Sequence, residues 1–249
     1  MKAGELVLLI SSDNSYLVEV RREKLHTQDG IFDLSQLLKR RIGGKIKTHL
    51  GKEYTIVKPN IADILEKKVR RAPQIIMPKD IGLIIAYTGI QPGSLIVDAG
   101  TGSGFLSIFL ASYIKPGKVV TYERKKRFLE IARENIKVSG LSRYIKLKLK
   151  DVRKGIDEKN VDMVTLDMKD AEKVVKHAYK ALKPGGWLVV YSPYIEQVKS
   201  VVEEIKKKAF CSLKVVENIV REWQVERSTR PKTIGLMHSG WLTFARKIK

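Results

Sequence analysis

The chain has 249 residues, of which 43% are hydrophobic, so it can bury a substantial core and is long enough for one large α/β domain and a smaller one. No apolar run approaches the roughly 20 residues that a membrane-spanning helix needs, and the run at residues 6–10 is too short for a signal peptide, so we expect a cytoplasmic protein. With 48 basic and 27 acidic residues the net charge is +21, which favours a polyanionic partner over a membrane surface, because no basic amphipathic helix with an apolar face is evident.

The first 60 residues carry short strand-like runs separated by turn residues. Four such runs are expected, over residues 5–10, 15–20, 45–49 and 53–58. With a short helix over 34–40, they predict a small, β-rich and barrel-like domain spanning residues 1–60. Its basic residues form clusters that indicate either a solvated surface or, as the overall charge favours, a platform for nucleic acid.

Residues 61–77 are expected to link this domain to a larger one over 78–249. A helix is predicted over 78–90, where Pro78 suits a first helical turn. Strands and helices then alternate, with strands predicted over 95–99, 118–122, 145–149, 161–167 and 186–191 and helices over 104–114, 125–139, 171–182 and 195–208. Such alternation predicts an α/β fold with a doubly wound, mostly parallel sheet. Two long strand patterns, 213–226 and 240–248, predict a closing antiparallel pair.

A glycine-rich turn lies between the first strand and helix of this larger domain. Its three glycines, Gly100, Gly102 and Gly104, allow a tight bend and the close approach of a ligand. The helix behind the turn offers free N–H groups and the positive end of its dipole. Phe105 follows where a dinucleotide fingerprint has Gly or Ala, so the turn favours a ligand without a pyrophosphate, such as S-adenosylmethionine.

Acidic residues end the next strands of the predicted sheet. Glu123, Asp151 and Asp167 follow successive strands, and ligands of doubly wound sheets bind at the carboxyl ends of the strands. We expect Glu123 to hold the ribose hydroxyls and Asp151 with Val152 to frame the adenine. The predicted cofactor-binding residues are therefore Gly100, Thr101, Gly102, Ser103, Gly104, Phe105, Glu123, Asp151, Val152 and Asp167.

Further stretches resemble one family, the class I tRNA 1-methyladenosine methyltransferases. They are residues 72–76, Pro78-Lys79-Asp80, 97–107, Leu166-Asp167, 182–186, 191–198, Arg230-Pro231 and 238–247. The resemblance spans essentially the whole chain, and 191–198 and 238–247 are its family-specific parts. It implies methyl transfer from S-adenosylmethionine to N1 of an adenine in the TΨC arm of tRNA, at position 58 and in some archaeal members also 57. It further implies S-adenosylhomocysteine as product and a homotetramer.

The resemblance makes Asp167 the catalytic residue. A carboxylate that accepts a hydrogen bond from the exocyclic N6 amino group would raise electron density at N1 and stabilise the cation that forms. Because the adenine is normally stacked, it must be extruded into the pocket. Met77 and Tyr194 are candidates to pack against it, with ordinary core packing as the alternative. The chain departs from the family at Met77, where an aromatic residue is common, and at Met168-Lys169, where Leu-Pro is common.

Other methyltransferase classes fit the sequence less well. An adenine-N6 enzyme would carry an Asn/Asp-Pro-Pro-aromatic turn where this chain has residues 167–170, and a cytosine-C5 enzyme needs a cysteine near that strand, whereas Cys211 lies far along the chain. A protein isoaspartate methyltransferase has similar glycine motifs but gives no reason for the charge of +21. A non-catalytic tRNA-binding subunit would be expected to lack the glycine turn and Asp167.

Neither the cysteine nor the histidine content predicts a metal site. The single Cys211 excludes an internal disulfide and a cysteine-rich zinc site, and the 4 histidines are dispersed. Abundant lysine and glutamate also suit a thermophile, in which surface ion pairs stabilise more strongly. Heat adaptation does not explain the excess of basic over acidic residues.

Overall fold

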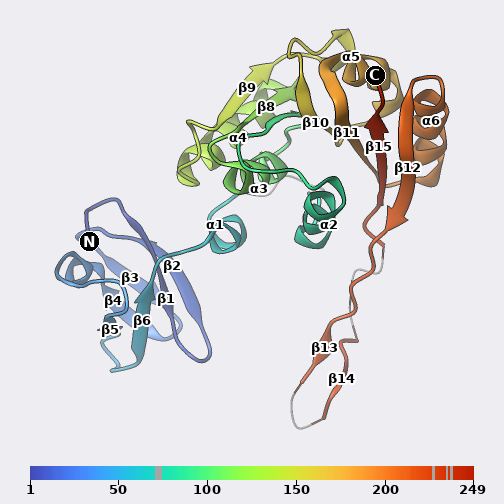
Figure 1. Cartoon of the computed structure of the whole chain (residues 1–249). Coiled ribbons are helices and arrows are strands. Elements are labelled where there is room, and N and C mark those ends of the chain that lie inside the picture. Colours follow the sequence, from blue (N-terminus) through green and yellow to red (C-terminus); the bar gives the residue numbers. More distant parts are fainter. Residues whose placement is uncertain (71–74, 226–227, 234, 236–237) are drawn as a thin grey trace. The chain divides into compact units, whose positions relative to one another are not determined.

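The computed structural model describes residues 1–70, 75–225, 228–233, 235 and 238–249. The chain divides into two compact units, Met1–Val69 and Arg70–Lys249 (Figure 1). The first unit includes helix α1 (Ile61–Lys67), which lies within the predicted linker 61–77. Residues 71–74 of that linker lie outside the described residues, and 72–74 also belong to the stretch 72–76. The domain boundaries at 60 and 77 stay predictions.

The first unit is rich in antiparallel strands, as the sequence predicts. Its larger sheet has the order β2-β1-β6-β5, with β1 at Leu6–Ile10, β2 at Ser15–Glu19, β5 at Lys45–Lys47 and β6 at Glu53–Val57. The expected helix is a 3₁₀ helix at Leu34–Lys39. A second pair, β3 (Lys24–Thr27) with β4 (Gly30–Asp33), was not expected from the sequence, because each strand has only 4 residues and no long apolar run.

The second unit contains a seven-stranded sheet of order β12-β15-β11-β10-β7-β8-β9. The strands are β7 (Leu95–Ala99), β8 (Lys118–Glu123), β9 (Ile145–Leu149), β10 (Val161–Leu166), β11 (Leu182–Ser192), β12 (Phe210–Glu217) and β15 (Trp241–Lys247). All adjacent pairs are parallel except the two that involve β15. The predicted doubly wound, mostly parallel sheet is therefore confirmed. Its strand order reverses between β7 and β10, the place where such sheets bind ligands.

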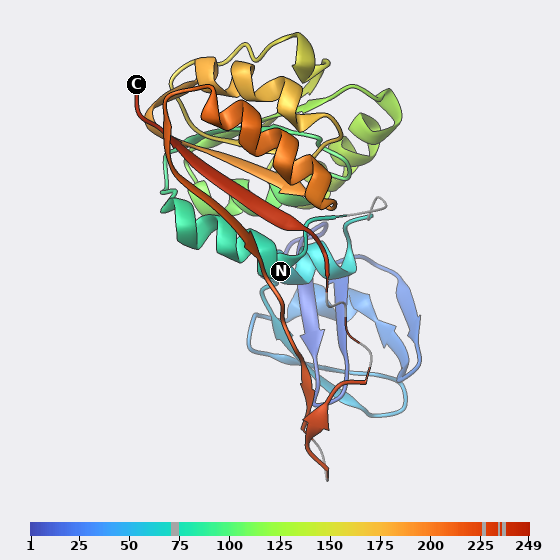
Figure 2. The same cartoon turned by 90° about the vertical axis from the view of Figure 1, so that its right-hand side faces the viewer.

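Helices cover both faces of this sheet (Figure 2). They are α2 (Pro78–Thr88), α3 (Phe105–Ile114), α4 (Lys126–Val138), α5 (Val175–Ala181) and α6 (Ile195–Lys206). Helix α4 is amphipathic, because its buried residues Leu129, Ala132 and Ile136 recur at helical spacing. Helix α3 is apolar nearly all round and buries 7 of its residues, so it holds the glycine-rich turn before it against the core.

The prediction of one continuous strand over 213–226 is wrong within the described residues, and residue 226 itself lies outside them. Strand β12 ends at Glu217, and a separate pair forms between β13 (Trp223–Gln224) and β14 (Arg230–Pro231). This β13–β14 hairpin continues away from the sheet beyond β12 and β15 (Figure 1, Figure 2). Apolar residues at 219–225 give the sequence a strand-like appearance, but Ile219, Val220 and Val225 are exposed rather than buried in the sheet.

Candidate active site

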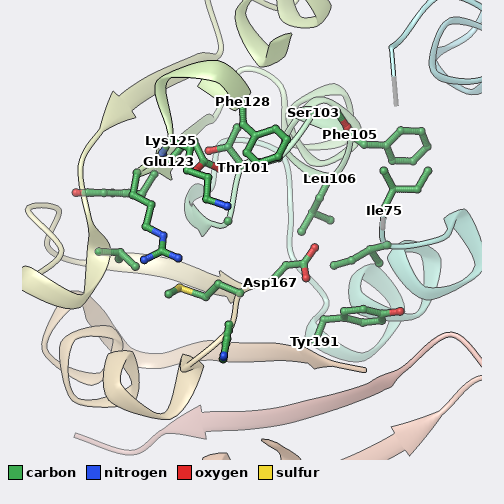
Figure 3. Close-up of a pocket in the computed structure, with 18 of the residues that line it drawn as sticks. Ile75, Thr101, Ser103, Phe105, Leu106, Glu123, Lys125, Phe128, Asp167 and Tyr191 are labelled. Atoms are coloured by element: carbon green, nitrogen blue, oxygen red, sulfur yellow. Dashed lines mark hydrogen bonds between the residues drawn. The ribbon is translucent and has the colours of Figure 1, made fainter. Parts of the chain in front are cut away.

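A cavity of about 550 Å³ opens at the carboxyl ends of β7, β8 and β10 (Figure 3). Ten residues predicted to bind cofactor or substrate line it: Gly100, Thr101, Gly102, Ser103, Phe105, Glu123, Asp151, Val152, Asp167 and Tyr194. Gly104 is not among the lining residues; it forms the N-cap of α3, and a Cβ on it would lie against Ala132 of α4. Met77 does not line the cavity either. It forms the N-cap of α2, and its neighbours Ile75 and Ile76 line the wall instead.

The glycine turn owes its shape to backbone angles that only glycine adopts easily. Gly100, Gly102 and Gly104 have φ angles of +96°, +54° and +80°. A Cβ on Gly100 would lie 1.9 Å from the carbonyl oxygen of Asp167, so the turn and the end of β10 touch backbone to backbone. No side chain caps α3, which leaves its first N–H groups available to a ligand.

The buried carboxylate of Asp98, which the sequence did not single out, supports the glycine turn from within the sheet. Asp98 is 1% exposed and accepts hydrogen bonds from the hydroxyls of Ser107, Thr121 (2.9 Å) and Thr165 (2.7 Å). Thr121 in turn shares a hydrogen bond of 2.6 Å with Thr101. Asp98 thereby joins α3, β8 and β10 beneath the cavity. An aspartate inside the apolar run 95–99 was the signal that could have revealed it.

Glu123 faces the glycine turn in a fixed orientation. Its carboxylate accepts hydrogen bonds from the backbone N–H groups of Gly102 (3.2 Å) and Lys125 (2.8 Å), and it is 8% exposed. Asp151 is held differently, because the Arg153 side chain donates to both of its oxygens at 2.6–3.1 Å. This arginine lowers the pKa of Asp151 to about 2, so the carboxylate next to Val152 is ionised and already paired.

Asp167 is the free carboxylate of the cavity. It directly follows β10, and its backbone N–H donates to the carbonyl of Ala99 (2.9 Å). Its side chain is directed into the cavity near Leu106 and Tyr191 (Figure 3), is partly exposed there and has no hydrogen-bond partner among the described residues. Burial and then the nearby Asp98 carboxylate raise the pKa of Asp167 to about 7.

The opposite wall depends on contacts between segments far apart in the sequence. The Tyr191 hydroxyl donates to the carbonyl of Ser239, and the Ser239 hydroxyl donates to Asp80 (3.0 Å). Lys79 forms an ion pair with Asp80 (2.8 Å) and also donates to Ser239 (2.8 Å). A Cβ on Gly240 would lie 2.6 Å from the Tyr191 ring. Residues 78–80 and 238–240 therefore support one side of the cavity together.

These side chains fit S-adenosylmethionine. The Ser103 hydroxyl is buried in the turn and has no hydrogen-bond partner among the described residues, so it can bind a polar group in the cavity. Glu123 accepts hydrogen bonds, as a ribose diol requires. In the described part of the chain, no three His, Cys, Asp or Glu side chains are grouped to hold a metal ion. No described helix is both long and apolar enough to cross a membrane.

The chain matches one protein-family model, over residues 65–239, and that family is described as the tRNA methyltransferase complex GCD14 subunit. It is 38% identical to the tRNA (adenine(57)-N(1)/adenine(58)-N(1))-methyltransferase TrmI of Methanocaldococcus jannaschii, over 93% of this chain and 90% of that protein. It is 30% identical to the tRNA (adenine(58)-N(1))-methyltransferase TrmI of Thermus thermophilus, over 99% of this chain and 98% of that protein.

Solved structures agree along the whole chain. The tRNA (m1A58) methyltransferase TrmI of Aquifex aeolicus superposes with a TM-score of 0.83 and 25% identity, covering 100% of this chain and 99% of that one. A structure described as an S-adenosylmethionine-dependent O-methyltransferase from Thermotoga maritima superposes with a TM-score of 0.89 and 31% identity, covering 100% and 95%. Both relatives have the class I methyltransferase fold, and this chain shares it.

Proposed function

This chain belongs to the tRNA methyltransferase family described as the GCD14 subunit, and from that premise we propose that it methylates N1 of an adenine in the TΨC arm of tRNA. The methyl donor is S-adenosylmethionine. The target is position 58 alone, or positions 57 and 58 as in the name of the M. jannaschii relative. The observation that carries the proposal is the Asp167 carboxylate beside the glycine turn, which has no hydrogen-bond partner in the part of the chain that the structure describes.

Each lining residue has a role in this proposal. S-adenosylmethionine supplies an electrophilic methyl group on a sulfonium. The glycine turn and the Ser103 hydroxyl bind its amino-acid end, Glu123 accepts its ribose hydroxyls, and Val152 borders its adenine next to the paired Asp151. Asp167 accepts a hydrogen bond from the N6 amino group of the target adenine, which strengthens N1 as a nucleophile and stabilises the positive charge it acquires. The carbon–sulfur bond breaks as the N1–carbon bond forms.

Tyr194 is the better of the two candidates to pack against the extruded base. It lines the cavity at the start of α6 and is 60% exposed, so its ring is free to stack on a planar ligand. Met77 lies outside the lining, and the apolar side chains of Ile75 and Ile76 take its expected place. We therefore assign base stacking to Tyr194 and enclosure to the two isoleucines.

The homotetramer and the cytoplasmic location are also part of the proposal. Strand β12 is an edge strand with the half-exposed apolar residues Leu213 and Val215, and the β13–β14 hairpin exposes Trp223. Edge strands and exposed apolar residues of this kind support self-association. Growth at high temperature is supported only by the abundance of lysine and glutamate.

The proposal is tested with labelled S-adenosylmethionine and three acceptors: unmodified tRNA, a tRNA with both target adenines replaced, and a peptide pool. We expect label only in the unmodified tRNA, recovered as 1-methyladenosine, with reverse transcription stopping at position 58 or at 57 and 58. Label in peptides alone would instead fit an isoaspartate methyltransferase. The name of the T. maritima structure favours oxygen as the acceptor, and recovery of a 2′-O-methyl nucleoside would support that second function.

The raised pKa of Asp167 predicts a pH-dependent rate in the neutral range. Only the ionised carboxylate serves as a full acceptor for the N6 amino group, so the rate at low cofactor concentration should rise with pH through a midpoint of about 7. Asp98→Asn removes a neighbouring negative charge and should lower that midpoint. Initial rates between pH 5.5 and 8.5 measure both effects, and a flat profile for the wild-type protein would contradict them.

Unfolding does not account for such a loss of activity at low pH. Because the pKa of Asp167 is raised in the folded protein, its contribution to the free energy of unfolding is fully present below the unfolded pKa of about 3.9. That contribution is lost as the pH rises through about 7. This carboxyl therefore stabilises the fold most where the expected rate is lowest, and thermal unfolding at both pH extremes separates the two effects.

A further inference from the structure

Three basic residues at the mouth of the cavity form no ion pair with any described residue, although the charge of Arg124 contributes to the lowered pKa of Asp151. Arg124, Lys125 and Lys169 line the cavity and are exposed. The Lys125 ammonium lies 5.4 Å from the centre of the Phe128 ring, a contact that leaves its charge in place. By contrast, Lys150, which also lines the cavity, forms an ion pair with Asp157.

The position of these cations does not stabilise the helix beside them. Arg124 and Lys125 directly precede α4, whose first turn contains Lys126 and Arg127 and no acidic residue. Positive charges at a helix N-terminus oppose the helix dipole, which favours acidic residues there. A run of four basic residues at this place therefore requires another explanation.

The cofactor does not supply that explanation. S-adenosylmethionine carries two positive groups and one carboxylate, so three further cations around the cavity would repel it rather than attract it. Its proposed partners are Glu123 and the glycine turn. The charge of the mouth instead matches phosphate groups, which attract arginine and lysine through Coulomb interaction and the release of counterions.

We propose that Arg124, Lys125 and Lys169, here called the cationic rim, bind the RNA phosphates on either side of the adenine that enters the cavity. This inference rests on the proposed function. Arg124 and Lys125 follow the end of β8 and Lys169 follows the end of β10, and β7 lies between these two strands. The ends of two such strands are about 10 Å apart, so the cations lie on two sides of the mouth. An extruded base necessarily brings its flanking phosphates there.

The test removes the three charges together in the full chain, as Arg124→Gln/Lys125→Gln/Lys169→Gln. The control, Lys206→Gln/Lys207→Gln/Lys208→Gln, removes three exposed charges at the end of α6, of which Lys207 is paired with Glu204. Each protein is loaded with S-adenosylhomocysteine and titrated with unmodified tRNA between 50 and 200 mM KCl. The affinity for S-adenosylhomocysteine is measured separately by calorimetry.

We expect the rim variant to bind tRNA about 10- to 100-fold more weakly at 0.1 M salt. Its log affinity should also fall less steeply with log salt, with the magnitude of the slope smaller by about 2. Its affinity for S-adenosylhomocysteine should stay within about 2-fold of wild type, and the control should keep most of its tRNA affinity. Equal losses of tRNA affinity in the rim variant and the control would contradict the proposal that the cationic rim binds RNA phosphates. Weaker cofactor binding with unchanged tRNA binding in the rim variant would contradict it as well. Failure of the proposed function is distinct, because the wild-type protein would then methylate no tRNA.

Discussion

Asp167→Ala is expected to slow methylation of tRNA by about 10²- to 10³-fold, the usual cost of removing one group that stabilises charge in a transition state. Adenine N1 is a weak nucleophile, and it acquires a positive charge as the methyl group arrives. In the wild-type cavity the Asp167 carboxylate has no competing hydrogen bond among the described residues, so all of its acceptor capacity is available to the N6 amino group. Without it, the developing cation loses the carboxylate that would accept the hydrogen bond from its N6 amino group.

Single-turnover rates with saturating enzyme and cofactor measure this effect directly. S-adenosylhomocysteine and tRNA should still bind, because neither the glycine turn nor the rim changes. Asp167→Asn is the matched variant, since it keeps the shape of the side chain and removes its charge, and it should be nearly as slow as Asp167→Ala. Near-normal turnover in both variants would show that Asp167 is not the catalytic residue.

Gly100→Ala is expected to weaken S-adenosylmethionine binding by at least about 100-fold and to destabilise the second unit. The added Cβ would lie 1.9 Å from the Asp167 carbonyl oxygen and 2.7 Å from its carbon, and both are backbone atoms that cannot rotate away. The φ of +96° adds strain for any residue with a side chain. The turn and β10 must then separate, which displaces the N–H groups of the turn and the Asp167 carboxylate together.

Calorimetric titration with S-adenosylhomocysteine and the Tm of each variant measure the two effects. Gly140→Ala is the matched control, because Gly140 also has a positive φ, +71°, but has no atom within 4 Å of an added Cβ. It should show only the strain of the backbone, with a small fall in Tm and unchanged cofactor affinity. If Gly100→Ala behaved like this control, the close contact with Asp167 would not matter for binding.

The parts of the site predicted from sequence are those carried by single strands and the turns after them. Glu123 and Asp167 could be placed because parallel strands bring their carboxyl ends to one edge. The network through Asp80, Tyr191 and Ser239 could not, because its hydrogen bonds join residues 48 and 159 positions apart and no local pattern encodes such pairings. Asp98 stood in a predicted strand, but its function depends on hydroxyls that only the folded sheet brings to it.

The second half of the predicted strand 213–226 failed for a related reason. Apolar residues there resemble the buried strands of the sheet. However, Glu217 already pairs with Trp241, the first residue of the antiparallel strand β15, so Ile219 and Val220 have no residue of β15 opposite them. Strand propensity reflects how well a side chain fits a pleated, half-buried surface, and it does not supply a partner strand. Without a partner in the sheet, the chain leaves it after Glu217.

Lys79 contacts both ends of the segment that leaves the sheet and returns to it. Its ammonium donates to the carbonyl of Asn218 and to the hydroxyl of Ser239, and the Asn218 amide donates back to the carbonyl of Lys79 (2.9 Å). The point of departure and the point of return are thus fixed to α2 independently of what lies between them. Insertions or deletions within residues 219–237 can therefore change the length of this segment, and with it the surface offered to a binding partner, without moving Tyr191 at the cavity wall.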